Sequence, residues 1–104
     1  MHFIAVGTPQ RPDGSADLTA VHAAMRAVLA IAAPGDLIVG KSTVPVGTAQ
    51  ALLPEVASAG AALAWNPEFL REGFAVRDSL EPDRLVYGVA PDDTRSAGVL
   101  DRVY

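Results

Sequence analysis

Residues 61–73 read AALAWNPEFLREG, and in this stretch five apolar residues are followed at once by a polar cluster. The apolar half predicts a buried strand, and Asn66 with Pro67 predicts the cap and the first residue of a short helix. On that helix Glu68 and Glu72, four residues apart, would share one face. Their carboxylates have two interpretations: they favour the positive end of the helix dipole, which is the more common role, or they carry out acid/base chemistry.

Three further apolar runs predict strands, and the segments between the strands predict helices. The strands are expected at residues 2–6, 36–41 and 84–89, and the helices at residues 15–33, 48–58, 74–80 and 91–104. Ser15 or Asp17 would cap the first helix, and Pro54 is expected to kink or split the second. Strands that alternate with helices at this spacing predict an α/β fold with parallel pairing through right-handed crossovers.

Small polar residues follow three of the predicted strands. They are Thr8 after the first, Ser42 and Thr43 after the second, and Asn66 with Glu68 after the third. In an open parallel sheet, ligands bind outside the carboxyl ends of the strands. We therefore expect these side chains to line one edge of the sheet and to form a site for a small polar ligand.

The composition argues against several classes of function. The chain has 104 residues, a net charge of −4 and a single lysine, so it is expected to form at most one domain and to bind no nucleic acid. It has no apolar run of the roughly 20 residues that a membrane span needs, so we expect a cytoplasmic protein without membrane contact. The two histidines have no metal-ligand spacing, and no cysteine is present. Abundant arginine and alanine suggest a bacterial source.

Five segments of the chain carry a recognisable pattern. They are VGTPQ at 6–10, DGSADL at 13–18, KSTVPVGT at 41–48, NPEFLREG at 66–73 and PDR at 82–84. In this order they resemble the UDP-glucose 6-dehydrogenases, a branch of the UDP-glucose/GDP-mannose dehydrogenase family. The sister GDP-mannose enzymes differ around the second and fifth segments, so the UDP-glucose branch is favoured.

The resemblance implies a partial Rossmann-like three-layer sandwich with about four mainly parallel strands and crossover helices. Residues 1–104 would be the latter half of the N-terminal NAD-binding domain, with the first βαβ half and the C-terminal catalytic and substrate domains absent. The family oxidises UDP-glucose to UDP-glucuronate in two steps, each of which reduces one NAD⁺. UDP-glucose is thus the expected substrate and NAD the expected cofactor.

The resemblance also assigns roles to individual residues. The catalytic residues would be Glu68, in acid/base work, and Thr43, whose hydroxyl would lie near the reacting centre. The cofactor-binding residues would be Val6, Gly7, Thr8, Pro9, Gln10, Ser42, Thr43, Val44 and Glu72. The substrate-binding residues would be Glu68, Phe69, Leu70, Arg71 and Glu72. We expect Trp65 and Phe69 to bury Glu68 in part.

Two charged residues keep two interpretations each. Lys41 is either a strand-end surface charge or a ligand contact, and it is not expected to be the family's catalytic lysine. Arg84 would bind phosphate or, as favoured by its neighbours, pair with Asp83 or Glu81.

The chain also departs from the family pattern. It contains neither the Gly-x-Gly-x-x-Gly turn that binds the dinucleotide pyrophosphate nor the cysteine nucleophile of the second oxidation. We therefore expect the chain alone to be inactive and to bind NAD weakly. The alternatives are a GDP-mannose or other nucleotide-sugar dehydrogenase fragment, a module that binds nucleotide sugars without catalysis, and a domain that self-associates into a homo-oligomer.

Overall fold

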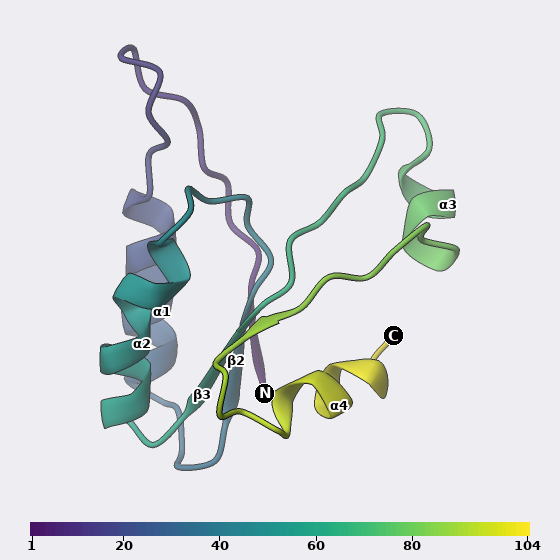
Figure 1. The fold of residues 1–104 in the computed structure, drawn as a ribbon. Helices are drawn as coiled ribbons and strands as arrows, with labels where there is room; N and C mark the ends of the chain where they lie inside the picture. Colours follow the sequence, from purple (N-terminus) through teal and green to yellow (C-terminus); the bar gives the residue numbers. More distant parts are fainter.

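A computed structural model describes residues 1–104 as a four-stranded sheet with helices on both faces (Figure 1). The strands are β1 (His2–Ile4), β2 (Leu37–Gly40), β3 (Ala62–Trp65) and β4 (Gly88–Val89). Their order in the sheet is β1-β2-β3-β4, and the first three are parallel. The predicted fold class, an α/β sandwich with mainly parallel strands, is confirmed.

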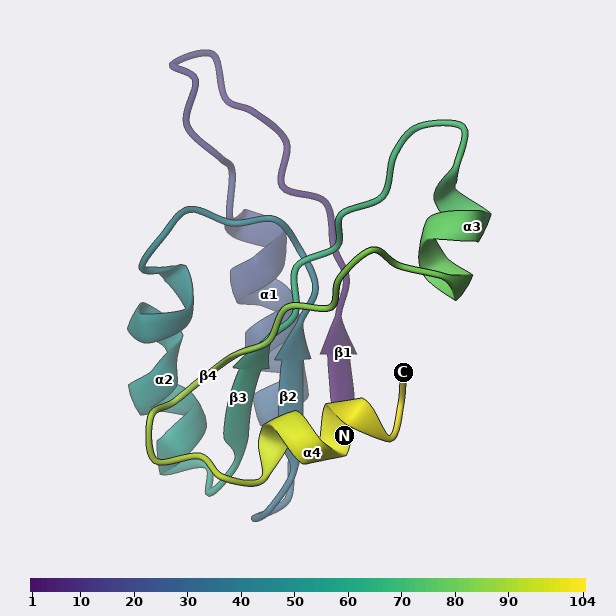
Figure 2. The same ribbon diagram turned by 45° about the vertical axis from the view of Figure 1, so that its right-hand side comes forward.

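Three of the four helices form two layers around this sheet, and α3 (Ala75–Leu80) lies away from it (Figures 1 and 2). The three are α1 (Thr19–Leu29), α2 (Thr48–Ser58) and α4 (Ser96–Asp101). Helices α1 and α2 lie side by side over one face, and α4 covers the other face (Figure 2). All four residues of β2 are buried, because this central strand is covered on both sides.

Alternate residues of β2 supply the two apolar clusters of the core. Ile38 packs with Val21 and Met25 of α1 on one face, whereas Val39 packs with Leu100 of α4 on the other. This period-2 alternation fixes the register of the sheet, since a slip of one residue would exchange the two faces. It also fixes which side chains leave the carboxyl ends of the strands.

The C-terminal end of β2 fits closely against Trp65 at the end of β3. A Cβ atom on Gly40 would lie 2.5 Å from Cε3 of the Trp65 ring, so no other residue fits there without a shift. The Trp65 indole Nε1 donates to the Ser42 carbonyl at 2.9 Å. Two neighbouring strand ends are thereby held together at the edge where the site was predicted.

The helix boundaries differ from the prediction. Helix α1 is shorter than residues 15–33 and α4 is shorter than residues 91–104, each at both ends. Leu18, rather than Ser15 or Asp17, occupies the N-cap position of α1, and its side chain makes no capping hydrogen bond. Asp17 nevertheless accepts from the backbone N–H of Thr19, and Asp93 accepts from that of Ser96. The expected break at Pro54 is absent, since α2 continues through it as one helix.

Residues 66–87 form a projecting arm, and here two predictions are wrong. Helix α3 does not cross the sheet but lies at the tip of the arm, away from the strands (Figures 1 and 2). The chain returns beside its outgoing path, so β4 pairs with β3 antiparallel and has only two residues. A parallel fourth strand would have required a crossover helix packed on the sheet.

The helix predicted to begin at Asn66 is also absent, because residues 66–71 have no regular structure. The Asn66 side chain donates to the Val86 carbonyl on the returning segment of the arm at 3.0 Å, so it does not cap a helix. The Arg71 N–H donates to a carboxylate oxygen of Asp78 rather than to a carbonyl four residues earlier. Glu68 and Glu72 therefore do not share a helical face.

None of the helices has the length and apolar character needed to cross a membrane.

Candidate functional site

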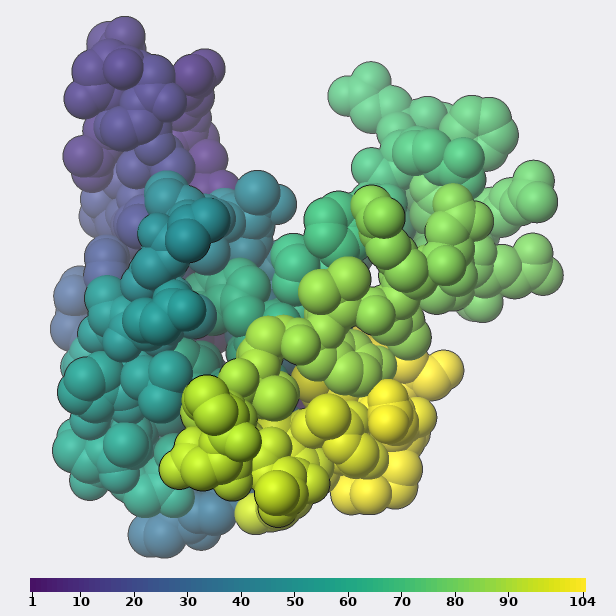
Figure 3. Space-filling view, viewed as in Figure 1, coloured from purple at the N-terminus to yellow at the C-terminus, as the bar shows by residue number.

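Two cavities lie at the C-terminal edge of the parallel strands, and the first, the strand-end cavity, has a volume of about 340 Å³. It is lined by Ala5, Val6, Gly7, Thr8, Lys41, Ser42, Thr43, Glu68 and Leu70. Figure 3 shows the surface hollowed between the projecting loop that precedes α1 and the arm. Residues predicted from three separate strand ends thus meet in one place.

The hydroxyl groups of this cavity differ in what they contact. The Ser42 hydroxyl is buried, accepts from the Val6 N–H at 3.0 Å and donates to the Val6 carbonyl at 2.6 Å. The Thr8 hydroxyl donates to the Thr43 carbonyl at 2.7 Å. Both side chains therefore tie β1 to β2, whereas the exposed Thr43 hydroxyl makes no hydrogen bond within the chain and is free for a ligand.

The backbone at Gly7 is open to a flat or charged ligand. Gly7 is exposed, and a Cβ atom there would meet no atom within 4 Å. Glycine at such a position lets a ligand approach the main chain closely. The wall formed by residues 5–8 and the free Thr43 hydroxyl can therefore contact a polar ligand placed along the strand ends.

The second cavity, the arm cavity, lies between the outgoing and returning segments of the arm and has a volume of about 350 Å³. It is lined by Lys41, Asn66, Pro67, Glu68, Phe69, Leu70, Arg71, Asp78, Ser79, Pro82, Asp83, Arg84, Leu85 and Tyr104. Lys41, Glu68 and Leu70 also line the strand-end cavity. A ligand in either cavity would therefore meet the same lysine and the same glutamate.

A polar network at the base of the arm cavity joins three segments of the chain. The Lys41 ammonium donates to Oδ1 of Asn66 at 3.1 Å and to the Tyr104 hydroxyl at 3.0 Å. The Tyr104 hydroxyl in turn donates to the same Asn66 oxygen at 2.6 Å. Sequence reasoning missed Tyr104, because it is 38 residues from Asn66 and no motif links them.

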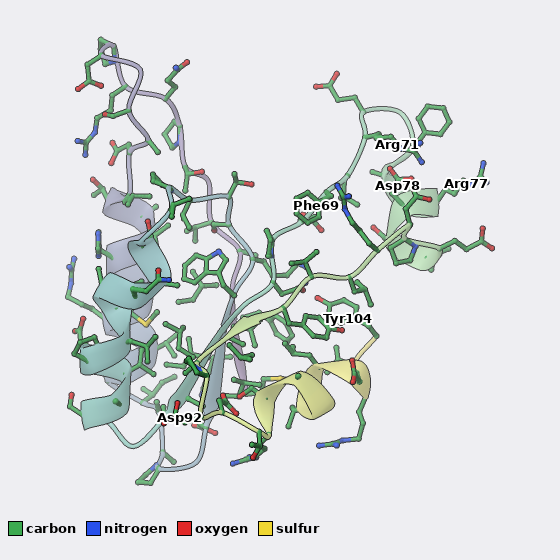
Figure 4. All side chains as sticks on the ribbon, in the orientation of Figure 1. Phe69, Arg71, Arg77, Asp78, Asp92 and Tyr104 are labelled. Atoms are coloured by element: carbon green, nitrogen blue, oxygen red, sulfur yellow. The ribbon has the colours of Figure 1, made fainter.

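Arg71 and Asp78 close the tip of the arm, and Figure 4 shows their side chains facing each other. The Arg71 N–H and Nε each donate to Oδ2 of Asp78 at 3.0 Å, and a second guanidinium nitrogen donates to Oδ1. These hydrogen bonds lower the pKa of Asp78 to about 2. The Arg71 carbonyl accepts from the Phe74 N–H. The hydrogen bonds of Arg71 therefore stabilise the arm. Asp78 was not predicted, since nothing in its spacing marks it.

The glutamates do not have the environment expected from the sequence. Glu68 lines both cavities and its side chain is exposed, so Phe69, which is itself 53% exposed, does not bury it. Trp65 is buried in the core and does not cover Glu68. Glu72 lies in the turn at residues 72–74 and lines neither cavity.

Three other predicted cofactor residues flank the strand-end cavity without lining it. They are Pro9, Gln10 and Val44. Gln10 belongs to the projecting loop, where it forms an antiparallel bridge with Ala16.

The favoured interpretation of Arg84 was wrong. Its guanidinium forms no ion pair with Asp83 or Glu81 and lies over the Phe69 ring, 5.2 Å from the centroid.

Comparison with known proteins identifies the family from which this arrangement comes. Residues 1–104 match the sequence model of the NAD binding domain of the UDP-glucose/GDP-mannose dehydrogenase family. UDP-glucose 6-dehydrogenase of Rhizobium meliloti (strain 1021) is 47% identical over 98% of this chain. The corresponding enzyme of Pseudomonas aeruginosa is 43% identical over the same share. The chain spans 24% of the length of each of these relatives.

Solved structures show the same fold. A UDP-glucose dehydrogenase from Pyrobaculum islandicum matches with a TM-score of 0.84 and 49% identity, over 98% of this chain and 25% of that one. GDP-mannose dehydrogenase from Pseudomonas aeruginosa, solved as a ternary complex, also has a TM-score of 0.84 but only 28% identity, over 98% and 26% of the two chains.

Proposed function

The chain belongs to the UDP-glucose/GDP-mannose dehydrogenase family, and from this premise we propose that it supplies part of the NAD and sugar-nucleotide site of a UDP-glucose 6-dehydrogenase. The whole protein would oxidise UDP-glucose to UDP-glucuronate. The observation that carries this proposal is the meeting of the strand-end cavity and the arm cavity at Lys41, Glu68 and Leu70. Two adjoining cavities that share a wall suit a reaction between two bound ligands.

The residues of the strand-end cavity would hold NAD⁺, which would supply the hydride acceptor for oxidation of the substrate alcohol. The open backbone at Gly7 would lie along the dinucleotide. The Thr43 hydroxyl would donate to the ligand or to a water molecule beside it, since it has no partner within the chain. Ser42 and Thr8 would act indirectly, because their hydroxyls hold the strand ends that form the cavity.

The sugar nucleotide would occupy the arm cavity, with its reacting end toward the wall that both cavities share. Glu68 is the carboxylate on that wall, so it would accept or return the proton of the reacting hydroxyl. The Lys41 ammonium, which lines the same wall, would favour a developing negative charge on oxygen. Phe69 and Leu70 would contact the sugar nucleotide along the outgoing segment of the arm.

The second oxidation needs a nucleophile that this chain does not contain. Without cysteine, none of its residues can form the covalent thioester that the family resemblance implies. We therefore propose that the chain binds UDP-glucose but does not catalyse the complete reaction by itself.

Titration calorimetry combined with an NADH absorbance assay tests this function. We expect saturable binding of UDP-glucose to the purified protein, at least about tenfold weaker binding of GDP-mannose, and no steady-state formation of NADH. Glu68→Gln should leave the fold intact, because the side chain is exposed. A steady rate of NADH formation would contradict the proposed inactivity, and the absence of UDP-glucose binding would contradict the proposed site.

GDP-mannose is the second candidate substrate, because the GDP-mannose dehydrogenase structure matches this fold with the same TM-score of 0.84. The higher identity to the UDP-glucose enzyme, 49% against 28%, favours UDP-glucose. Tighter binding of GDP-mannose in the same titration would reverse the assignment. Cytoplasmic location and self-association stay predictions, and sedimentation at increasing concentration would test the second.

A further inference from the structure

The arm cavity contains two arginines whose surroundings differ. Arg71 is held by Asp78 through its backbone N–H and two guanidinium nitrogens. Arg84, on the returning segment of the arm, has a side chain that makes neither an ion pair nor a hydrogen bond. Since an arginine carries five N–H donors, Arg84 leaves a complete donor set available to a ligand in this cavity.

Phe69 holds this free guanidinium in place. The ring lies on the outgoing segment of the arm, and the Arg84 guanidinium lies over it at 5.2 Å from its centroid. This cation–π contact takes up no hydrogen-bond acceptor, so the N–H donors of Arg84 stay available to an anion. The planar fork of arginine matches two oxygens of a phosphate group, so a guanidinium with free donors suits phosphate binding.

The positive and negative charges in the arm cavity balance, so an anion would be recognised by individual hydrogen bonds. The lining holds the cations Lys41, Arg71 and Arg84 and the carboxylates Glu68, Asp78 and Asp83. Because Arg71 and Asp78 pair with each other, the cavity has no strong net charge to attract anions. A diphosphate would therefore be held by directed hydrogen bonds from Arg84, since the Lys41 ammonium already donates to Asn66 and Tyr104.

We propose that Arg84, stacked on Phe69, binds the diphosphate group of the sugar nucleotide in the arm cavity. This role deepens the function proposed above and rests on it, because it assigns the arm cavity to the sugar nucleotide. Arg71, although it lies on the same cavity wall, keeps the arm closed. The specificity of the site for a nucleoside diphosphate ligand over a free sugar then depends on Arg84.

The test compares Arg84→Gln and Arg84→Lys with the unaltered protein by titration calorimetry. UDP-glucose, inorganic pyrophosphate and NAD⁺ are the three probes. Arg26→Gln is the matched control, since it removes the same charge from α1, where the residue lines neither cavity. Circular dichroism melting checks that each variant is folded.

We expect Arg84→Gln to weaken the binding of UDP-glucose and pyrophosphate by about 10- to 100-fold, as for the loss of a hydrogen-bonded charge. Arg84→Lys should recover part of this loss, because it restores the charge without the fork. Binding of the phosphate probes to Arg84→Gln should also depend less on salt concentration than binding to the unaltered protein. The affinity for NAD⁺ and the behaviour of Arg26→Gln should be unchanged.

Four results would contradict one proposal or the other. Equal affinities of Arg84→Gln and the unaltered protein for both phosphate probes would overturn the role of Arg84, and so would a failure of the unaltered protein to bind either probe. An equal loss of NAD⁺ affinity would move Arg84 to the cofactor and overturn its assignment to the sugar nucleotide. Arg84-dependent binding of pyrophosphate without binding of UDP-glucose would retain the phosphate site and refute the proposed function.

Discussion

The body of the molecule, residues 1–65 and 88–104, is held by apolar burial, whereas the arm, residues 66–87, is held by polar contacts. The body packs Ile38 and Val39 into two clusters on opposite faces of the sheet. The arm exposes most of its large apolar side chains, including Phe74 at 53% and Leu80 at 78%. Its shape depends on the Arg71–Asp78 pair at the tip and on Asn66 at the base.

Because of this difference, the walls of the two cavities are held with different stability. Seven of the nine residues that line the strand-end cavity belong to the body, so most of its wall keeps its shape as long as the protein is folded. The arm cavity can open when a few polar contacts break, because local stability follows local burial. One short chain therefore combines a rigid wall, which we propose contacts the cofactor, with a wall that opens locally, which we propose contacts the sugar nucleotide.

The largest effect is expected from truncating a core side chain of the body. Ile38 on β2 is fully buried, so Ile38→Ala should lower the free energy of unfolding by about 2–5 kcal/mol. Leu80→Ala on the arm is the matched control and should change it by no more than about 0.5 kcal/mol, since 78% of Leu80 is exposed. Urea denaturation measures both. Similar losses for the two variants would mean that the arm contributes to the core.

A smaller loss is expected at the junction of β2 with Trp65. Gly40→Ala places a methyl group 2.5 Å from the indole ring, and we expect a loss of about 1–3 kcal/mol as the strand ends move apart. Gly98→Ala is the control with the opposite sign. It lies within α4 with no atom within 4 Å of the added methyl group, so it should gain about 0.5–1 kcal/mol. A stabilised Gly40→Ala protein would show that the ring moves freely.

Ser42 and Thr43 are adjacent and chemically alike, but their predicted effects differ. Ser42→Ala leaves the Val6 N–H and carbonyl without their partner, so we expect a loss of about 1–3 kcal/mol in thermal unfolding measurements. Thr43→Val removes a hydroxyl without a partner and should leave stability within about 0.5 kcal/mol while weakening NAD⁺ binding. If Thr43→Val instead destabilises the protein and leaves binding unchanged, its hydroxyl is structural.

Much of the body was predictable from the sequence. The first three strands follow from short apolar runs bounded by turn residues, and their polar ends converge because parallel strands end at one edge. The division of roles between Ser42 and Thr43 was not predictable, since a hydroxyl at a strand end has the same local pattern whether it faces Val6 or solvent. That difference depends on the direction in which each side chain points after the end of β2.

The arm was predicted poorly because its contacts are not local. Asn66 followed by Pro67 is a common start of a helix, but the amide nitrogen of the Asn66 side chain donates to Val86, 20 residues away. Arg71 likewise depends on Asp78, seven residues later. Local propensity is a weak guide where each backbone polar group finds a distant side-chain partner. The antiparallel direction of β4 follows from the same contacts, since they turn the chain back before it can cross the sheet.

The smallest effect on overall stability is expected from acid at the tip of the arm. Interaction with Arg71 lowers the pKa of Asp78 from its ordinary value of 3.8 to about 2. Asp78 is ionised in both the folded and the unfolded state at neutral pH, so its stabilising contribution is complete there. As the pH falls below about 4 the unfolded state binds its proton first, and the contribution is lost by about pH 2.

Hydrogen exchange at the Arg71 amide isolates this contribution, because that N–H donates directly to Asp78. A residue-specific measurement is needed, since Asp17 and Asp36 in the body also have pKa values lowered to about 2. At neutral pH, Asp78→Asn should lower the protection of this amide by about tenfold, and Asp92→Asn, on an exposed loop of the body, should not change it. Equal protection in both variants would mean that the arm keeps its shape without the Arg71–Asp78 pair, and the contrast between body and arm would then have another cause.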